Sequence, residues 1–494
     1  MKLDLPWVDE SEWRKRTDLD RPPIEALADS VWRIANLYEI KTEEGARLNF
    51  EPTPEQRVII WDILVRGCRN IIIPKARKLG MSTVLCVIAA DKLAFEMGQE
   101  IALVDKTKDD AVKKLESITK FAIDSLHPGL RSALETVTDN EGEIALRALG
   151  TKDDLVSKMA AGVSFRGGTP QMLIVSEWAT IQFSEPSRSE EIKTGAMEAA
   201  RRGIRIIETT WKGGKGGHVW GYVELAMETP EEEKTPEDWR LRFFPWWVDK
   251  RNTRDGDTSR IDTETARYLD EKEREIEVTF TPGQRVWYWH AKRELGIFIK
   301  RENPTTLDEC WSAPVEGAIY ADLIERLRVE RKILPMERND AVEVDTFWDL
   351  GSPHNTVVWY VQRLGAGAFD VIDVDGGIDL TTEERVTHMA RKGYAFGAHY
   401  IPHDGAADQK GGLSYQEELM RAGLENVRVV PRTSDIELGI NAVRKMLPLC
   451  VFNSQPHAAD DETNTIAAGR MSHPRLRPGW ENYPVGLKRL TSGR

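Results

Sequence analysis

The feature that most constrains this chain is a strand, basic turn and helix segment at residues 70–85. It reads Asn-Ile-Ile-Ile-Pro-Lys-Ala-Arg-Lys-Leu-Gly-Met-Ser-Thr-Val-Leu. Backbone N–H groups at the start of such a helix point toward the turn and favour phosphate binding. Gly80 permits a close backbone approach, and Ser82 stands where a hydroxyl binds Mg²⁺. Because Lys75 and Met81 replace the first glycine and the lysine of the standard phosphate loop, an ordinary basic turn remains the alternative.

Two later apolar runs end in polar residues that suit phosphate chemistry. Residues 172–175 form a predicted strand that leads into Ser176 and Glu177. Glu177 can polarise an attacking water, whereas Ser176 stands where an aspartate would face Mg²⁺. Residues 204–207 form another predicted strand, which leads into Glu208, Thr209 and Thr210 and then a glycine-rich loop at 211–217. Together with the phosphate turn, these segments predict a nucleotide-binding domain.

The first half of the chain follows the pattern of a mainly parallel α/β domain. Apolar runs at 70–73, 100–104, 172–175 and 204–207 alternate with helical stretches. We expect an accessory, helical segment at 1–49, a P-loop domain at 50–225, a charged helical subdomain or linker at 226–335, and a second α/β domain at 336–494 with an atypical tail from about 452. With 494 residues, the chain is long enough for two or three domains.

The second domain shows the element order βββαβαβα, which is typical of a ribonuclease-H-like fold. The predicted strands are 344–350, 356–362, 369–374, 398–402 and 427–431, and the predicted helices are 381–392, 415–422 and 435–447. Asp349 ends the first strand and Asp404 follows the fourth. In this fold these strands are neighbours, so both carboxylates could hold the metal ions of a nuclease. A turn-capping role is the alternative for each, and Asp373 and Asp375 are interpreted as turn or sheet-edge residues.

Charge and cysteine content exclude several function classes. The net charge of −13 means that nucleic acid would have to bind local basic patches. The candidate contacts are Arg201, Arg202, Arg205, Lys212, Lys215, Arg326, Arg328, Arg331 and Lys332, although the last four also fit a solvated helix face. Four scattered cysteines predict neither a zinc site nor a disulfide framework, and no apolar run is long enough to span a membrane.

The ordered set of motifs resembles the large terminase subunit of tailed bacteriophages, encoded by a phage or a prophage. The resemblance spans roughly residues 50–450 and implies a RecA/ASCE-like P-loop ATPase followed by a ribonuclease-H-like nuclease. It assigns Glu177 as the catalytic glutamate, Thr209 and Thr210 as the coupling motif, and Arg166 as a candidate arginine finger. The residues 301–311 are similar to the stretch that closes the ATPase half. The implied ATP-binding residues are Gln56 on the adenine side, Lys75, Lys78, Gly80, Ser82 and Thr83.

The resemblance also implies the metals of the second site. Asp349 and Asp404 match the first two ligands of two divalent ions, Mg²⁺ or Mn²⁺, while Ser82 would bind the Mg²⁺ of ATP. The family places a third acid on a terminal helix, but the sequence after Phe452 changes character, and Asp460 is a weak candidate. Either the tail has diverged or a frame change has replaced the original end. His354 and His403 flank the expected metal site and are interpreted as packing or turn residues.

The function implied is that of a viral DNA-packaging motor. Such an enzyme hydrolyses ATP to move double-stranded DNA into a procapsid and cuts the concatemer with a metal-dependent endonuclease. Its partners would be DNA, the small terminase subunit and the portal protein, with a homo-oligomeric ring when docked, no membrane, and the host bacterial cytoplasm as its location. Two alternatives stay open: a helicase-like translocase fused to a nuclease-like domain, and an inactive prophage remnant that only binds DNA or partners.

Overall fold

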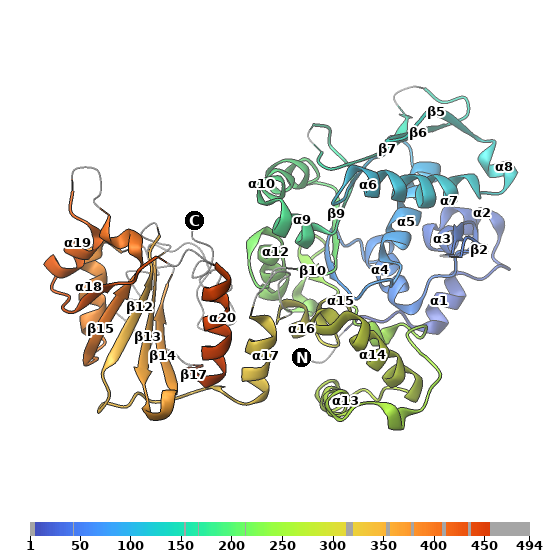
Figure 1. Cartoon of the computed structure of the whole chain (residues 1–494). Coiled ribbons are helices and arrows are strands. Elements are labelled where there is room, and N and C mark those ends of the chain that lie inside the picture. Colours follow the sequence, from blue (N-terminus) through green and yellow to red (C-terminus); the bar gives the residue numbers. More distant parts are fainter. Residues whose placement is uncertain are drawn as a thin grey trace. The chain divides into compact units, whose positions relative to one another are not determined.

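The computed structural model describes residues 5–42, 44–152, 155–165, 167–212, 214–312, 320–351, 356–376, 380–407, 412–432 and 436–454. The chain divides into two compact units, Met1–Pro314 and Val315–Arg494, each with its own large sheet (Figure 1). Within the described ranges, no helix has both the length and the apolar character needed to cross a membrane.

The first unit is built on an eight-stranded sheet with the order β10-β3-β9-β8-β4-β7-β6-β5. The strands are β3 (Asn70–Pro74), β4 (Glu100–Val104), β5 (Leu134–Asn140), β6 (Glu143–Ala148), β7 (Ser157–Gly162), β8 (Met172–Ser176), β9 (Ile204–Thr209) and β10 (Trp239–Leu241). The pairs from β10 to β7 are parallel, and β5, β6 and β7 pair in antiparallel fashion. The four predicted strands and the mainly parallel sheet are therefore confirmed, and the structure adds that the four strands lie side by side.

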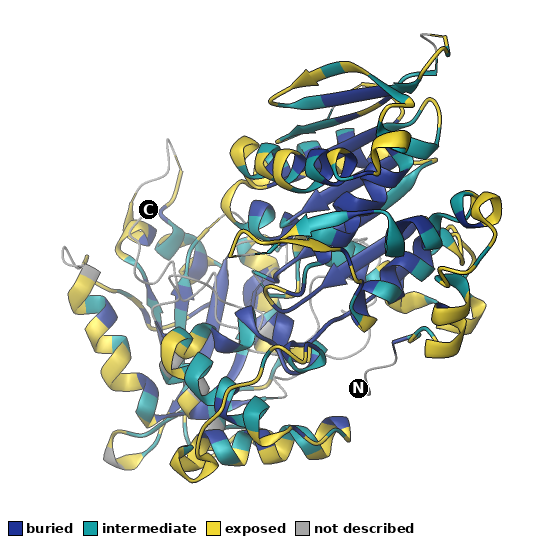
Figure 2. Ribbon diagram, turned by 90° about the vertical axis from the view of Figure 1, so that its right-hand side faces the viewer, coloured by how far each residue is buried: buried dark blue, intermediate teal, exposed yellow. Residues whose placement is uncertain are grey.

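The central strands are apolar because they are covered on both faces. Ile71 and Ile73 of β3 pack into one core, and Ile72 between them packs into the other. Figure 2 shows these strands as the buried interior of the unit, with exposed residues on the outer surfaces of helices. Since β9 lies between β3 and β8, the carboxyl ends of these three strands meet at one edge of the sheet.

The helices of the first unit surround this sheet. Their bounds are α1 (Glu10–Arg16), α2 (Pro23–Ala28), α3 (Ser30–Asn36), α4 (Pro54–Leu64), α5 (Met81–Phe95), α6 (Lys108–Lys114), α7 (Phe121–Asp124), α8 (Pro128–Arg131), α9 (Trp178–Ser184), α10 (Pro186–Glu191), α11 (Met197–Ala199), α12 (Gly217–Glu228), α13 (Thr263–Ile276), α14 (Pro282–Leu295), α15 (Ile299–Glu302) and α16 (Leu307–Ser312). Helix α5 begins directly after the basic turn, as the sequence predicts.

Three features of this unit differ from expectation. The mainly helical start also contains a hairpin of β1 (Glu39–Lys41) and β2 (Arg47–Asn49). Strands β5 to β7 extend the sheet, although β5 is largely exposed and so lacks an apolar run. The charged stretch from 226 does not form a separate body, because β10 joins the sheet and Trp246 stacks on Trp287 within the core, so the first unit continues to Pro314.

The second unit has a seven-stranded sheet with the order β11-β17-β14-β13-β12-β15-β16. The strands are β11 (Ile333–Leu334), β12 (Val344–Asp349), β13 (Val357–Arg363), β14 (Phe369–Asp375), β15 (Phe396–Ile401), β16 (Val427–Val429) and β17 (Cys450–Asn453). Strands β12, β13 and β14 form an antiparallel meander, and β15 pairs with β12 in parallel. This is the predicted ribonuclease-H-like arrangement, with the first and fourth predicted strands as neighbours.

Helices cover both faces of the second sheet (Figure 1). They are α17 (Ala321–Val329), α18 (Thr382–Arg391), α19 (Tyr415–Arg421) and α20 (Ile436–Met446). Val386 and Met389 of α18 and Leu419 of α19 pack on Trp348 and Tyr360 in one core. Helices α17 and α20 contribute Leu327 and Ile440 to another, which also contacts Phe452.

Candidate functional site

The basic turn after β3 directs a lysine at two carboxylates. Lys75 follows β3 directly, and its Nζ lies 3.1 Å from Oε2 of Glu208 and 3.7 Å from Oε1 of Glu177. Its side chain is 9% exposed. Burial disfavours the charged form, but Glu208 and Glu177 outweigh it and raise the pKa of Lys75. The ammonium is therefore charged and placed at the carboxyl ends of β8 and β9.

The turn itself is held in shape by Gly80 and Gln56. Gly80 adopts a left-handed conformation (φ 71°) at the N-terminus of α5, and a Cβ there would lie 2.5 Å from Nε2 of Gln56. That nitrogen donates to the Gly80 carbonyl at 2.9 Å, while Oε1 of Gln56 accepts from the backbone N–H of Thr53 at 3.0 Å. Gln56 thus joins the start of α4 to the basic turn. Its adenine-side role stays a prediction.

Two serine hydroxyls meet on the Glu208 carboxylate. Oγ of Ser82, in the first turn of α5, donates to Oε1 of Glu208 at 2.5 Å, and Oγ of Ser176 donates to the same oxygen at 2.5 Å. Glu208 and Ser176 are also in register between the parallel strands β9 and β8. Thr83 follows Ser82 and is half-buried, and Lys78 is exposed with φ 61°.

A second lysine, which the sequence interpretation missed, joins this cluster from α6. Nζ of Lys114 lies 2.7 Å from Oδ2 of Asp105 and 3.5 Å from Oε1 of Glu208, and it donates to Oγ of Ser176. Asp105 directly follows β4, so its place at the carboxyl end of a parallel strand was a usable signal. Lys114 gave none, because it lies in a charged stretch, at the end of α6, with no motif around it.

The two lysines decide the protonation of Glu208. This carboxylate is fully buried, which by itself would raise its pKa. Lys75, Lys114 and the hydroxyls of Ser176 and Ser82 outweigh burial and hold the pKa of Glu208 well below its usual range. Glu208 is therefore an anion in contact with the chain's own cations.

Glu177 has a different environment at the end of β8. It caps α9 in a left-handed conformation (φ 56°) and accepts from the backbone N–H of Thr210 at 3.3 Å and from its hydroxyl at 3.4 Å. Burial raises the pKa of Glu177, although Lys75 opposes that rise. Thr209 is buried beside it, and its hydroxyl accepts from the Ala179 N–H at 3.3 Å. A partly exposed glutamate with a raised pKa suits general-base chemistry.

The segment predicted to close the ATPase half packs directly on the phosphate turn. The Glu302 carbonyl accepts from the backbone N–H of Arg77 at 2.9 Å, and the two side chains form an ion pair. Farther on, the Glu309 carboxylate accepts from the Thr305 N–H and the Tyr268 hydroxyl, both at 2.7 Å. This packing fixes the outer side of the turn.

Several predicted residues lie away from the carboxylate cluster, and others fall outside the described residues. Arg166, His354 and Asp460 fall outside the described residues. Arg205 donates to Asn70 at 2.7 Å and lies over the Trp239 ring, so it is a packing residue at the opposite end of β9 from the cluster. The remaining predicted DNA contacts are exposed or half-buried: Arg201, Arg202, Lys212, Lys215, Arg326, Arg328, Arg331 and Lys332.

The second candidate site lies at the carboxyl ends of β12 and β15. Asp349 is the last residue of β12 and is half-buried, and Asp404 is exposed in the turn after β15. The turn packs against the residue that follows β12, because a Cβ on Gly405 would lie 3.0 Å from the Leu350 side chain. His403 is exposed. Within the described part of the chain, no three His, Cys, Asp or Glu side chains gather closely enough to hold a metal ion.

Asp373 and Asp375 are not the turn or sheet-edge residues that we expected. Both are buried in β14, which lies between β13 and β17. Nζ of Lys392 lies 2.7 Å from Oδ2 of Asp373 and 2.9 Å from Oδ1 of Asp375, and the Tyr360 hydroxyl donates to Asp375. Burial is outweighed by His388 and Lys392, which hold the pKa of Asp375 at about 2. Lys392 offsets one negative charge, and burial raises the pKa of Asp373, the other carboxyl group.

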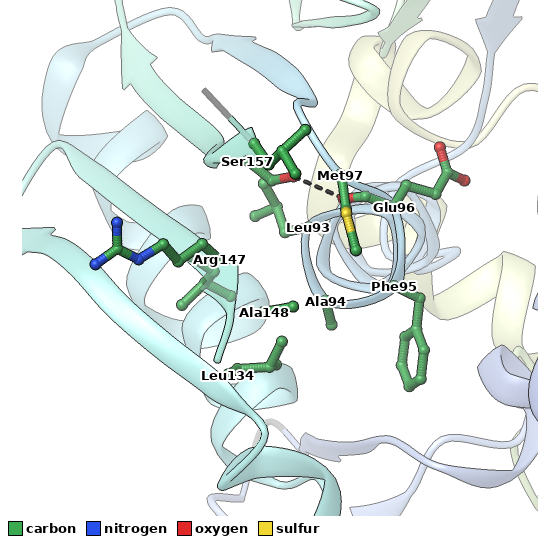
Figure 3. Close-up of a pocket in the computed structure, with 11 residues that line it drawn as sticks. Leu93, Ala94, Phe95, Glu96, Met97, Leu134, Arg147, Ala148 and Ser157 are labelled. Atoms are coloured by element: carbon green, nitrogen blue, oxygen red, sulfur yellow. Dashed lines mark hydrogen bonds between the residues drawn. The ribbon is translucent and has the colours of Figure 1, made fainter. Parts of the chain in front are cut away.

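A hollow of about 160 Å³ lies in the first unit, at the C-terminal end of α5 (Figure 3). It is bounded by Phe95 in the last turn of α5, by Met97 shortly after that helix, and by Leu146 of β6. Helix α5 has 15 residues, so its two ends are roughly 20 Å apart. The hollow is therefore remote from the phosphate turn.

Comparisons with known proteins return solved structures only. No family model matches the chain, and no curated protein matches it. The large terminase of bacteriophage HK97 is 13% identical with a TM-score of 0.42, over 86% of this chain and 90% of that one. The large terminase ATPase domain of Thermus phage P74-26 is 16% identical (TM-score 0.36; 52% and 94% covered). The large terminase nuclease domain of P22 is 21% identical (TM-score 0.21; 25% and 69% covered). All three of these solved structures, to which the chain is similar, are phage large terminases or domains of them.

Proposed function

We propose that this chain is a large terminase subunit, the ATP-driven motor of phage DNA packaging, with a metal-dependent endonuclease in its second unit. The observation that carries the proposal is the cluster at the carboxyl ends of β3, β8 and β9. There the Nζ of Lys75 lies 3.1 Å from Glu208 and 3.7 Å from Glu177. Catalysis of phosphoryl transfer rests on positioning and charge, which this cluster supplies.

Each residue of the cluster has a task in ATP hydrolysis. Lys75 and the N–H groups at the start of α5 neutralise and position the phosphates. Glu177 orients the attacking water and takes its proton, and Thr210 connects Glu177 to β9 through two hydrogen bonds. When bound, Mg²⁺ would offset the negative charge of the phosphates. The Ser82 hydroxyl, in the first turn of α5, would hold this ion.

The second unit supports the nuclease part of the proposal. Asp349 and Asp404 lie at adjacent strand ends, which is where two carboxylates can share divalent ions. Such ions, Mg²⁺ or Mn²⁺, would stabilise the attacking and leaving oxygens of the phosphodiester. The proposed partners are double-stranded DNA, a small terminase subunit and a portal protein, with a ring of copies as the working form and the host bacterial cytoplasm as its location.

The helicase-like alternative is disfavoured by the second unit. A helicase would need a second parallel RecA-like sheet, but β12, β13 and β14 form an antiparallel meander. The inactive-remnant alternative rests on Ser176, which provides no carboxylate to Mg²⁺, and it is decided by experiment.

The first prediction tests ATP turnover. Wild-type protein should hydrolyse ATP with stimulation by double-stranded DNA, and Glu177→Gln should lower the rate by roughly 10²–10⁴-fold because the general base is lost. ATP binding should persist in the variant. Glu190→Gln, an exposed glutamate of α10, is the matched control and should keep the wild-type rate. Binding without turnover in the wild type would establish the remnant instead.

A further inference from the structure

The strand that should carry the metal-side acid ends in Ser176, yet a carboxylate still lies beside the phosphate-turn hydroxyl. Ser176 and Glu208 are paired in register on neighbouring parallel strands, and their side chains are hydrogen-bonded at 2.5 Å. The carboxylate nearest to the end of β8 is therefore supplied by the neighbouring strand β9.

The position of this carboxylate is set by Ser82. Oε1 of Glu208 accepts from the Ser82 hydroxyl at 2.5 Å, although the two residues are 126 positions apart in the sequence. In a phosphate loop that hydroxyl is a ligand of Mg²⁺. A carboxylate in hydrogen-bond contact with it is placed to bind the same ion, directly or through a water, since Mg²⁺ keeps several waters in protein sites.

The surroundings of Glu208 already hold a cation among oxygens. The Lys114 ammonium contacts Asp105 at 2.7 Å, Glu208 at 3.5 Å and the Ser176 hydroxyl. Oxygens from three strand ends thus converge on one positive charge. Asp105 and Glu208 are both buried, and buried carboxylates are retained only where a cation compensates them.

We propose that Glu208 of β9 takes the place of the missing β8 aspartate as the carboxylate that holds the Mg²⁺ of bound nucleotide beside Ser82. The inference rests on the proposed ATP hydrolysis. It assigns different roles to the two glutamates of the site. Glu208 binds the metal ion, and Glu177 orients the attacking water. The competing interpretation is that Glu208 is only a counter-charge for Lys75 and Lys114.

The test measures metal-dependent binding rather than turnover. The full chain is titrated calorimetrically with ATPγS in excess Mg²⁺ and again in EDTA. The dissociation constant in EDTA divided by the constant in Mg²⁺ is the metal-dependent ratio, and it measures how much the ion contributes to binding. Mn²⁺ in place of Mg²⁺ allows the bound ion to be followed by electron paramagnetic resonance. Removing a carboxylate that supports a metal typically lowers metal affinity about 10–100-fold. Glu208→Gln should therefore reduce the ratio by that factor, while Glu177→Gln keeps it.

Two further variants separate the metal role from the counter-charge role. Glu208→Asp keeps the charge facing both lysines but withdraws the carboxylate from Ser82, so it should fold and still lose the metal-dependent ratio. In Ser176→Asp/Glu208→Gln the carboxylate returns to β8, and the ratio should recover. A Glu208→Asp protein with the wild-type ratio would overturn the inference, even if Glu208→Gln does not fold. A wild-type chain that fails to bind ATPγS at all would instead overturn the proposed function.

Discussion

The two candidate sites both lie at the carboxyl ends of neighbouring strands, but they hold their carboxylates differently. In the first unit Glu208 is fully buried, and Lys75 and Lys114 compensate its charge. In the second unit Asp404 is exposed and Asp349 is half-buried. A buried charge needs a compensating charge from the chain itself, whereas an exposed one is solvated by water. Substitutions that remove a charged side chain should therefore lower the stability of the protein at the first site, as well as its activity. At the second site they should lower activity without lowering stability.

The largest stability effect is expected at Lys75. Lys75→Met would leave Glu208 buried with Lys114 as its remaining lysine contact. Breaking a buried ion pair typically costs about 3–5 kcal/mol, and because Lys114 remains we expect a value near the lower limit, together with loss of ATP turnover. Urea unfolding of the first unit, followed by tryptophan fluorescence, measures the change.

The control for this variant is Lys78→Met in the same turn. Lys78 is exposed, so the unfolding midpoint should stay close to that of the wild type. Equal destabilisation by both substitutions would mean that burial of charge does not distinguish these positions.

An intermediate effect is expected inside the second unit, away from its candidate site. The pKa of Asp375 is held at about 2, below the ordinary value of 3.8, so the charged form is favoured by folding. This depression corresponds to roughly 2 kcal/mol of stability at neutral pH, which Asp375→Asn should remove. Because the folded pKa is the lower one, the contribution is complete above about pH 4 and declines toward pH 2. Unfolding curves of the two proteins should therefore converge as the pH falls.

Asp370→Asn provides the matched control on the same strand. Burial raises the pKa of Asp370, so the charged form is disfavoured by folding and its removal should not destabilise the protein. Destabilisation of similar size in both variants would show that the carboxylate of Asp375 is not specifically stabilised.

The smallest stability effect is expected at the candidate nuclease site. Asp404→Asn changes an exposed side chain, so the melting temperature should remain that of the wild type, while Mn²⁺-dependent nicking of plasmid DNA should be lost. Asp349→Asn should likewise abolish nicking. Asp340→Asn, another exposed position of this unit, should retain it. Nicking that persists in Asp404→Asn would exclude this residue from the metal site.

Much of the fold was predictable because apolar runs encode buried strands. The runs at 70–73, 100–104, 172–175 and 204–207 became β3, β4, β8 and β9 with small changes at their ends. Strand β5 was not predicted, since its residues are mostly exposed and follow no apolar pattern. The Asp349 and Asp404 positions were predictable, because one ends a strand of the expected fold and the other follows its parallel neighbour.

The sequence by itself determined the basic turn, since Lys75, Gly80 and Ser82 lie within eight residues and their local order predicts a strand, a turn and a helix. Only the tertiary structure decided which carboxylate faces that turn. Ser82 and Lys114 reach Glu208 across 126 and 94 positions of sequence, and they meet because β9 is inserted between β3 and β8. Strand order depends on how the helical crossovers pack on the sheet, and no local pattern of residues carries that information.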